Sequence, residues 1–313
     1  IYYYSLAANQ DDENAQLILG IIYEEGKYIE KDIQKAIFYY SQAVNHNVLK
    51  AELRLGLIYY SDHSISNNIK KAISYLSLAA NQNDPDSQYV LGTIYSEDNE
   101  EHDINKAIHY LTLSANQKYN KALFSLGNIY YQGEKIERDI KKAIYFFSIA
   151  SDLDDPDSQY CLGLIYDKSS SITRDREKAI HCYTLAANQG NVEAQYNLGV
   201  IYENRDFTPI DINKAIYYYS LAASQNHPKS QYKIASFYSD GHYVPYNLQK
   251  AIYYFTLSAN NGNEDAQIDL AVLYYEQKDI DKAIQYWLMA SDQNNPIAQY
   301  NLGQIFENGK LIP

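Results

Sequence analysis

A pattern of about 36 residues recurs from one end of this 313-residue chain to the other. Each unit opens with a small residue, at positions Ala15, Ala51, Ser87, Ala122, Ser158, Ala194, Ser230, Ala266 and Ala298. A Lys-Ala pair later in each unit is an independent marker, and its alanines are Ala36, Ala72, Ala107, Ala143, Ala179, Ala215, Ala251 and Ala283. Because the two markers keep the same spacing after their first step, the chain is one supersecondary unit repeated, without a single central core.

The spacing of apolar residues predicts a helix in each half of the repeat. After Ala194, apolar residues follow four, seven and eight positions later, as Leu198, Ile201 and Tyr202, which places all of them on one helical stripe. Asp or Asn stands four residues before the alanine of the Lys-Ala pair and is predicted to cap the second helix. These predicted caps are Asp32, Asn68, Asp103, Asp139, Asp175, Asp211, Asn247 and Asp279.

Glycine follows the central leucine of the first helix in most units, although glycine inside a helix costs about 1 kcal/mol relative to alanine. We interpret this recurrence as a sign that a neighbouring helix approaches too closely to admit a side chain. The glycines are Gly20, Gly56, Gly92, Gly127, Gly163, Gly199 and Gly303.

Residues 194–223 resemble the Sel-1-like repeat family, whose members are relatives of the tetratricopeptide repeat. The matching positions are Ala194, Leu198, Gly199, Tyr202, Asp211, Lys214, Ala215, Tyr218, Tyr219, Ala222 and Ala223. The resemblance extends over essentially the whole chain. It implies an all-α fold, a right-handed superhelical α-solenoid of antiparallel helix pairs, and a role as adaptor or scaffold. A cysteine-rich bacterial branch of the family is linked to β-lactam binding.

The predicted domain organisation is a single array over residues 1–313. A partial unit at 1–14 precedes repeats that start near 15, 51, 87, 122, 158, 194, 230 and 266, and a partial unit at 298–313 follows them. A loop glycine of the family pattern is present only at Gly26, Gly133, Gly241 and Gly309, and the loop before Ala283 is short. Both ends fall inside a repeat, so the chain is expected to be part of a longer array.

The charge balance favours some partners over others. A formal net charge of −13 makes nucleic acid and anionic membranes poor partners, and makes basic or neutral peptides better ones. Recurrent basic pairs such as Lys70-Lys71 are interpreted as a solvated face. No apolar run reaches 18 residues, so no membrane insertion is expected in this stretch. The oligomeric state is left open.

The two cysteines and the asparagines bear on the compartment. Cys161 and Cys182 do not recur from unit to unit and are predicted to be free thiols, which argues against the cysteine-rich branch. The chain is rich in Asn but has no Asn-x-Ser/Thr sequon, which favours the cytoplasm. A lumenal location would follow if a missing N-terminus carried a signal peptide.

No catalytic, cofactor or metal site is predicted, and the chain is expected not to be an enzyme. The seven histidines show no metal-ligand spacing, and no phosphate loop, GxGxxG, GxSxG or HExxH motif is present. Carboxylate pairs such as Glu24-Glu25 and Asp154-Asp155 lie in predicted loops and caps, where solvation explains them.

One further row of residues is a candidate for partner binding. Two positions after the opening small residue, the first helix keeps a large side chain on the side away from its apolar stripe. The aromatic members, our predicted partner-binding residues, are Tyr89, Phe124, Tyr160, Tyr196, Tyr232 and Tyr300. In tetratricopeptide-like solenoids this side lines the concave groove, so the row could grip an extended or helical peptide. The alternative is that these rings pack between adjacent first helices.

The sequence thus predicts a noncatalytic protein–protein interaction scaffold that binds protein or peptide partners on its concave face. Two alternatives remain open. The array could be the regulatory arm of a larger multidomain protein such as a kinase, or a hydrolase or ligand binder of the cysteine-rich type.

Overall fold

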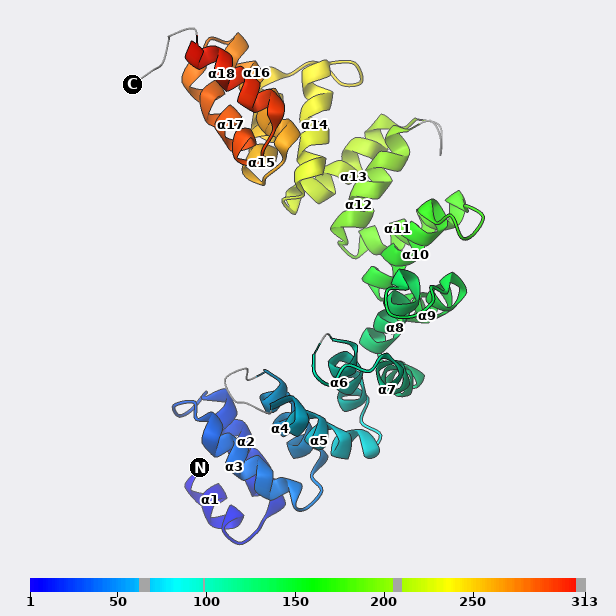
Figure 1. The fold of residues 1–313 in the computed structure, drawn as a ribbon, viewed down its shortest axis with the longest axis vertical. Coiled ribbons are helices and arrows are strands. Elements are labelled where there is room, and N and C mark those ends of the chain that lie inside the picture. The colour runs from blue at the N-terminus through cyan, green and yellow to red at the C-terminus, as the bar shows by residue number, and fades with distance from the viewer. Residues whose placement is uncertain (62–67, 98, 205–209, 308–313) are drawn as a thin grey trace. The chain divides into compact units, whose positions relative to one another are not determined.

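A computed structural model describes residues 1–61, 68–97, 99–204 and 210–307. Within these ranges the chain forms eighteen α-helices and no strand (Figure 1). The helices are α1 (Tyr2–Ala8), α2 (Glu13–Glu25), α3 (Ile33–Val44), α4 (Leu49–Ser61), α5 (Asn68–Asn81), α6 (Pro85–Ser96), α7 (Ile104–Asn116), α8 (Asn120–Gln132), α9 (Ile140–Asp152), α10 (Pro156–Lys168), α11 (Arg176–Asn188), α12 (Val192–Glu203), α13 (Ile212–Ser224), α14 (Pro228–Asp240), α15 (Leu248–Asn260), α16 (Glu264–Glu276), α17 (Ile280–Asp292) and α18 (Pro296–Glu307).

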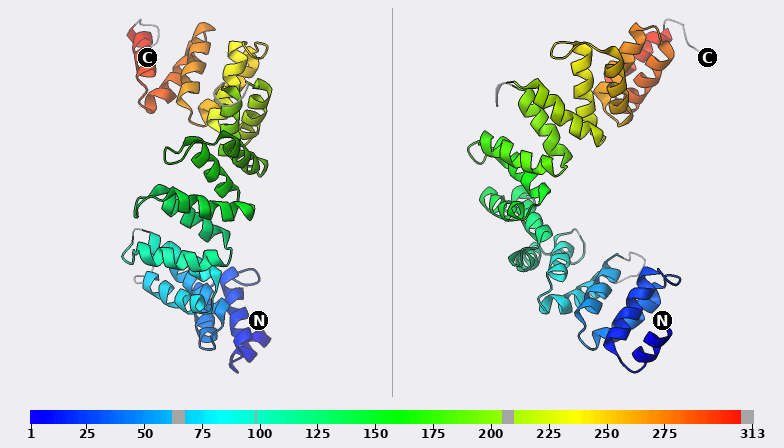
Figure 2. Two further views of the ribbon diagram at one scale, coloured as in Figure 1. Left: turned by 90° about the vertical axis from the view of Figure 1, so that its right-hand side faces the viewer. Right: turned by 180° about the vertical axis from the view of Figure 1, so that it is seen from behind.

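Each repeat consists of an even-numbered helix, here called the A helix, and the odd-numbered B helix that follows it. The pairs run from α2–α3 to α16–α17, while α1 is a B helix and α18 an A helix that lack a pair partner among the described residues. The chain divides into two compact units, Ile1–Ser158 and Gln159–Pro313, and within each unit successive helices lie side by side (Figure 2). The all-α array of helix pairs predicted from the sequence is confirmed.

The helices of a pair run antiparallel, and the B helices begin at the predicted caps with one exception. Ser114, near the end of α7, donates to the carbonyl of Pro85 at the start of α6, with a distance of 2.8 Å. At the opposite end of a pair, the Asp211 carboxylate accepts the backbone N–H of Lys214 and so caps α13. The same capping bond occurs at every other predicted B-helix cap except Asn68, which is itself the first residue of α5.

The recurrent glycine of the A helix accommodates a side chain of the B helix. A Cβ added at Gly199 would lie 2.5 Å from ring atoms of Tyr219, which is fully buried. Leu76 and Leu111 take the same place against Gly56 and Gly92. The predicted close approach of the two helices is confirmed, and we refer to this feature as the glycine notch.

In the B helices from α3 to α17, a lysine of the first turn contacts an aromatic ring of the preceding A helix, and in α13 it also contacts the N-cap residue. Lys214 Nζ lies 3.7 Å from Asp211 Oδ2 and 5.0 Å from the ring centroid of Tyr202, which stacks on Tyr218 at an interplanar angle of 3°. A cation over a ring at an exposed site contributes about 0.5–1 kcal/mol. The contact recurs at 4.8–5.4 Å for Lys35, Lys71, Lys106, Lys142, Lys178, Lys250 and Lys282. These exposed lysines therefore also brace the helix pair.

Glutamine side chains connect one repeat to the next. Gln195 is buried in α12 and donates to the carbonyl of Ala187 at the end of the preceding B helix, with a distance of 3.1 Å. Its own carbonyl oxygen accepts from Gln225 at the end of α13. Comparable chains run through Gln88, Gln231 and Gln267. These bonds satisfy polar groups that are buried at the joint between repeats.

Glu52 takes the glutamine position in α4, and we expect Glu52→Gln to stabilise the first unit at neutral pH. Burial raises the pKa of Glu52, which accepts from Gln82 at 2.8 Å. Because the folded-state pKa lies above the unfolded one, the wild type loses stability as the pH rises through that interval. A glutamine would carry no charge and could donate to the Val44 carbonyl, by analogy with the bond from Gln88 to Ala80.

Thermal unfolding at pH 7 should therefore show a midpoint a few degrees higher for Glu52→Gln, with the difference shrinking near pH 4. Glu30→Gln, at an exposed loop position, is the matched control and should change little. A Glu52→Gln variant that is no more stable than the control at pH 7 would contradict the expectation.

Loop geometry agrees with the sequence where it is described. Gly26, Gly133 and Gly241 end their A helices with φ values of 65°, 67° and 64°, a left-handed conformation that glycine adopts readily. The predicted loop glycine Gly309, and one of the seven histidines, His63, lie outside the described residues. Neither Cys161 nor Cys182 forms a disulfide, and burial raises the pKa of the Cys182 thiol to about 11.

Candidate functional site

The six aromatic residues predicted to bind a partner lie on A helices and are called here the A-face row. Two belong to the first unit and four to the second, in the order Tyr89, Phe124, Tyr160, Tyr196, Tyr232 and Tyr300. Five of them are half-buried, and Tyr300 on α18 is 65 % exposed. The side chains of the row are therefore neither fully buried nor, apart from Tyr300, mostly exposed.

Four of the five half-buried rings contact an aromatic ring on the B helix of the same repeat. Tyr196 lies 5.8 Å from Tyr219, and Tyr232 lies 5.6 Å from Phe255, measured between ring centroids. Equivalent pairs are Phe124–Phe147 and Tyr160–Tyr183. No B helix follows α18 within the described residues, and this explains the exposure of Tyr300. Each of these four rings thus packs against a B-helix ring on one side and is exposed to solvent on another.

Some rings of the row also contact the next A helix, which was the alternative considered for them. Tyr89 lies 5.4 Å from Tyr119, at the start of α8, and Tyr196 lies 4.9 Å from His227, at the start of α14. These contacts fix the orientation of the rings. A rigid aromatic ring at a surface loses little conformational entropy when a partner packs on it.

Charged side chains on the A helices are held in defined pairs between neighbouring repeats. Tyr219 donates its hydroxyl to Glu203 Oε2 at 2.6 Å, and Lys233 Nζ of the next A helix donates to Glu203 Oε1 at 3.0 Å. Burial, followed by the hydrogen bond to Glu203, raises the pKa of Tyr219. In the first unit the same arrangement joins Tyr40, Glu24 and Arg54.

Tyr232 is anchored in a similar way. Its hydroxyl donates to Asp269 Oδ2 on the following A helix, with a distance of 2.9 Å. Burial and the Asp269 charge raise the pKa of Tyr232 to about 12, and burial raises the pKa of Asp269. The hydroxyl is therefore protonated at neutral pH and can serve as a fixed donor between α14 and α16.

His227 caps α14 at a position where most other repeats have Asp or Asn. Its Nδ1 accepts the backbone N–H of Ser230 at 3.2 Å, its Nε2 lies 3.5 Å from Glu193, and Lys229 is also close enough to affect its charge. Burial lowers the pKa of His227 below its ordinary value of 6.5, although Glu193 acts in the opposite direction. The unfolded chain therefore takes up the proton first as the pH falls.

We expect the stability of the second unit to fall as the pH is lowered below about 6.5, because protonation removes the acceptor that caps α14. His227→Asn should make the unfolding midpoint less dependent on pH between about pH 7 and pH 5, since an asparagine cap accepts at either pH. Urea unfolding at several pH values checks this, with His181→Asn, an exposed histidine, as control. Equal pH slopes for wild type and His227→Asn would show that the cap does not titrate.

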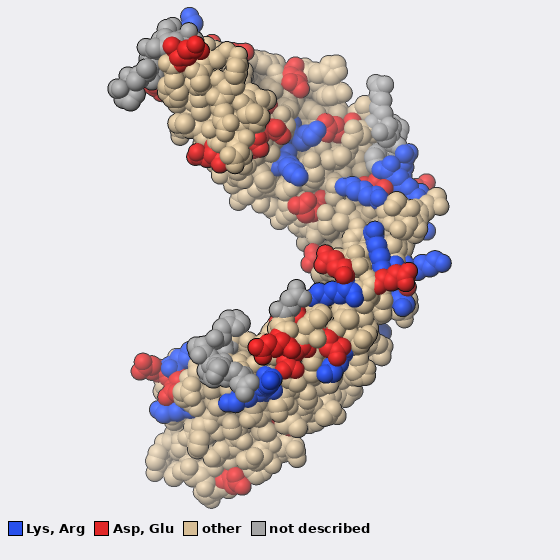
Figure 3. All heavy atoms as spheres, in the orientation of Figure 1, with Lys and Arg blue, Asp and Glu red and all other residues tan. Residues whose placement is uncertain are grey.

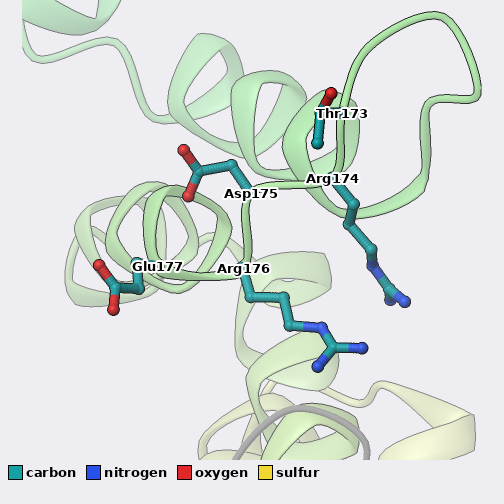
Figure 4. A pocket seen from close by; sticks show the side chains of 5 residues that line it. All are labelled: Thr173, Arg174, Asp175, Arg176 and Glu177. Atoms are coloured by element: carbon teal, nitrogen blue, oxygen red, sulfur yellow. The ribbon is translucent and has the colours of Figure 1, made fainter.

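Cavities occur along the edge formed by the A-to-B loops. One of about 580 Å³ is lined by Tyr202, residues 210–214 and Tyr243, and another of about 240 Å³ by residues including Ile104, Ile129 and Lys135. A third, of about 520 Å³, lies beside residues 173–177. Figure 4 shows Arg174 and Arg176 directed to one side of that segment and Asp175 and Glu177 to the other. Arg174 binds the buried carboxylate of Asp167 at 2.6 Å.

The face drawn in Figure 3 shows no patch of one charge, and the described side chains form no metal-binding cluster. Figure 3 shows basic and acidic side chains interspersed on the face turned to the viewer. Among the described residues, no cluster of three His, Cys, Asp or Glu could hold a metal ion. None of the described helices is long and apolar enough to cross a membrane.

Two features of the surface were not found by sequence reasoning. The pairing of Glu203 with Lys233 depends on which positions of adjacent A helices meet. The exposed aromatics of the B helices, by contrast, recur two residues after the Lys-Ala alanine and could have been found from that spacing. They are Phe38, Tyr145, Tyr217 and Tyr253.

Comparison with solved structures identifies close similarity in fold. The chain is 26 % identical to a Sel1 repeat protein from Oxalobacter formigenes, with a TM-score of 0.81 over 97 % of this chain and 89 % of that one. It is 25 % identical to a protective antigen present in uropathogenic Escherichia coli strains that displays an SLR fold, also with a TM-score of 0.81, over 98 % of this chain and 67 % of that one. No curated protein sequence matches the chain.

Ten segments match the Sel1 repeat. They are residues 1–12, 14–48, 49–84, 85–119, 120–155, 156–191, 192–227, 228–263, 264–295 and 296–313. Sel1 repeat proteins are in general noncatalytic scaffolds that bind other proteins. The chain belongs to the Sel1 repeat family.

Proposed function

We propose that this chain is a noncatalytic adaptor that binds a segment of a partner protein along the A helices of its second unit, the face expected to be concave. The observation that carries the proposal is the A-face row. In α12 and α14, Tyr196 and Tyr232 each rest on a buried B-helix ring while keeping part of their surface exposed. Supported aromatic rings of this kind are common anchors in protein interfaces.

The charges around the row indicate the chemistry of the partner. Glu203 is already paired with Lys233, and Asp269 accepts from Tyr232. These two carboxylates can therefore accept hydrogen bonds from a partner in fixed directions, but they add little uncompensated charge to the surface. Exposed Glu193 and Asp265 at the starts of α12 and α16, together with the net charge of −13, favour a basic partner. We therefore propose an extended or helical segment with apolar or aromatic anchors and flanking Lys or Arg. Nucleic acid is not the proposed partner.

Binding should depend on the A-face row more than on other exposed aromatics. A peptide selected from a displayed library against the whole chain would be titrated by fluorescence anisotropy against Tyr196→Leu/Tyr232→Leu. We expect affinity to fall by a factor of about ten or more, because leucine keeps the apolar contact with Tyr219 and Phe255 but removes ring area and a hydroxyl.

The matched control is Tyr217→Leu/Tyr253→Leu on the B helices of the same two repeats, where both tyrosines are exposed. It should leave affinity within about twofold. Circular dichroism would first establish that both double variants keep their helicity. Equal losses in the two variants, or a loss only in the B-helix variant, would exclude the A-face row as the binding surface.

Two further points belong to the same proposal. The repeats act as a single array over residues 1–313, and the chain works in the cytoplasm, as the lack of Asn-x-Ser/Thr sequons favours. Immunolocalisation of the protein to a secretory compartment of its natural source would exclude the second point.

A further inference from the structure

The turn between α15 and α16 differs from the other B-to-A turns in the residue that donates to the buried glutamine of the A helix. In other repeats this donor is itself a glutamine at the end of the B helix, namely Gln82, Gln117, Gln189, Gln225 or Gln293. In the α14–α15 repeat the donor is Asn261, whose Nδ2 lies 3.0 Å from Gln231 Oε1. Gly262 follows it. A shorter side-chain amide is thus joined to an unhindered backbone at this contact.

Asparagine followed by glycine is chemically labile. The backbone nitrogen of Gly262 can attack Cγ of Asn261 and close a five-membered ring, because glycine has no side chain to obstruct the approach. The N–Cγ bond forms, the Cγ–Nδ2 bond breaks, and the amide nitrogen leaves as ammonia with the proton that the backbone nitrogen gives up. Water then opens the succinimide at either carbonyl and yields aspartate or isoaspartate. A glutamine would have to close a six-membered ring, which forms more slowly.

The folded turn restrains this reaction but leaves room for it. Asn261 has a ψ of 15°, which directs the Gly262 nitrogen away from the Asn261 side chain. That nitrogen donates to the Ala259 carbonyl at 3.0 Å. Asn260, Asn261 and Gly262 are exposed, however, and a Cβ added at Gly262 would meet nothing within 4 Å. The turn can therefore open locally, as helix ends do, without displacing a neighbouring side chain.

The products do not fit the hydrogen bonds of this joint. Gln231 is fully buried and donates its Nε2 to the Ala223 carbonyl at 3.2 Å, so its Oε1 is the acceptor that faces Asn261. An aspartate carboxylate has no proton for that oxygen and places a charge beside it. Isoaspartate also lengthens the backbone by a carbon atom just before Asn263, which caps α16.

We propose that Asn261 is a site of spontaneous deamidation, with water as the co-reactant, and that its conversion breaks the hydrogen bonds that join the α12–α13 repeat to the α14–α15 repeat. The unmodified chain has bonds from Asn261 to Gln231 and from Gln231 to Ala223. After conversion the first of these bonds is lost. The array therefore loosens at this joint as the molecule ages, wherever its partners bind.

Peptide mapping by mass spectrometry follows the conversion in the purified chain, kept warm in a mildly alkaline buffer for several weeks. We expect Asn261 to convert before the flanking Asn260 and Asn263, and Gln189, which glycine also follows, to stay intact. Asn308, also followed by glycine, lies outside the described residues and is scored separately. Conversion at Asn261 no faster than at Asn260 would overturn the proposal.

Gln231→Ala tests whether the joint restrains the turn. Loss of the acceptor for Asn261 Nδ2 should raise the rate of conversion about two- to tenfold, the factor by which one ordinary hydrogen bond changes the population of an open state. Gln195→Ala makes the same change in the preceding repeat and should leave the rate unchanged. Circular dichroism would first establish that both variants keep their helicity. Equal rates in the wild type and in Gln231→Ala would contradict the link between the turn and the joint.

Two substitutions of Asn261 test the effect on the joint. Asn261→Asp reproduces one product and should lower the thermal unfolding midpoint of the second unit by about 2–4 °C, because the bond to Gln231 is lost. Asn261→Gln restores the residue of the other repeats, so it should keep the midpoint and abolish conversion at this position. If Asn261→Asp unfolds at the same temperature as the wild type, or if fully converted wild type does so, the joint does not loosen and the proposal fails.

Discussion

Tyr219→Ala is expected to lower the free energy of unfolding of the second unit by about 3–5 kcal/mol, the usual cost of removing a buried aromatic ring. The ring is fully buried, fills the notch at Gly199 and lies 5.8 Å from Tyr196. Its hydroxyl also donates to Glu203, which would keep Lys233 but lose its second partner. The resulting cavity would lie between α12 and α13, which are also held together by the stacked rings of Tyr202 and Tyr218.

Urea unfolding followed by circular dichroism would measure this loss. Tyr217→Ala removes the same side chain two residues earlier in α13, where it is exposed, and should cost no more than about 0.5 kcal/mol. Tyr219→Leu should fall between the two, since Leu76 and Leu111 fill the equivalent notch in the first unit. Similar losses for Tyr217→Ala and Tyr219→Ala would mean that the notch contact contributes little to the stability of the pair.

Gly199→Ala is expected to destabilise the second unit by about 1–3 kcal/mol, although alanine favours helix by about 1 kcal/mol. The new Cβ would lie 2.5 Å from ring atoms of Tyr219. That ring cannot swing aside without breaking its bond to Glu203. Ala235 does stand at this position opposite Phe255, whose ring carries no hydroxyl to hold it in place.

Gly303→Ala is the control, and it should change the free energy of unfolding in the opposite direction. Nothing lies within 4 Å of the added Cβ, so only the helix propensity remains and the variant should gain up to about 1 kcal/mol. The pair of variants is measured by the same urea unfolding as above. In the double variant Gly199→Ala/Tyr219→Ala the clash disappears, so its total cost should be less than the sum of the single costs. If the losses in the free energy of unfolding were additive, or if Gly199→Ala were stabilising, the close contact between Gly199 and Tyr219 would not limit the side chain at position 199.

Most of the repeat could be predicted because the same local features, such as helix caps and the glycine of the A helix, recur in unit after unit. The caps at Asp211 and its equivalents follow from the preference of Asp for orphan amides, and the glycine notch follows from the recurrence of an unfavourable residue. The predicted helix pairs and the lack of a disulfide at Cys182 follow in the same way. Repetition replaces comparison with other proteins in these cases.

The contacts between repeats could not be predicted as well. The pairing of Glu203 with Lys233 and of Tyr232 with Asp269 depends on how far each A helix is displaced from the next. The same displacement determines how much of the A-face row is covered. The recurrent lysines were interpreted as a solvated face. The ring that Lys214 contacts belongs to Tyr202 on the preceding helix, and the sequence alone does not show that these two side chains meet.

The central claim is that partners bind on the A helices, and the most direct test is site-specific photo-crosslinking. Benzoylphenylalanine would replace Tyr196 or Tyr232 on the A helices, and Tyr217 or Tyr253 on the B helices of the same repeats. With the selected peptide present, we expect covalent adducts at positions 196 and 232, and few at 217 and 253. Adducts confined to 217 and 253, or formed equally at all four positions, would contradict the account.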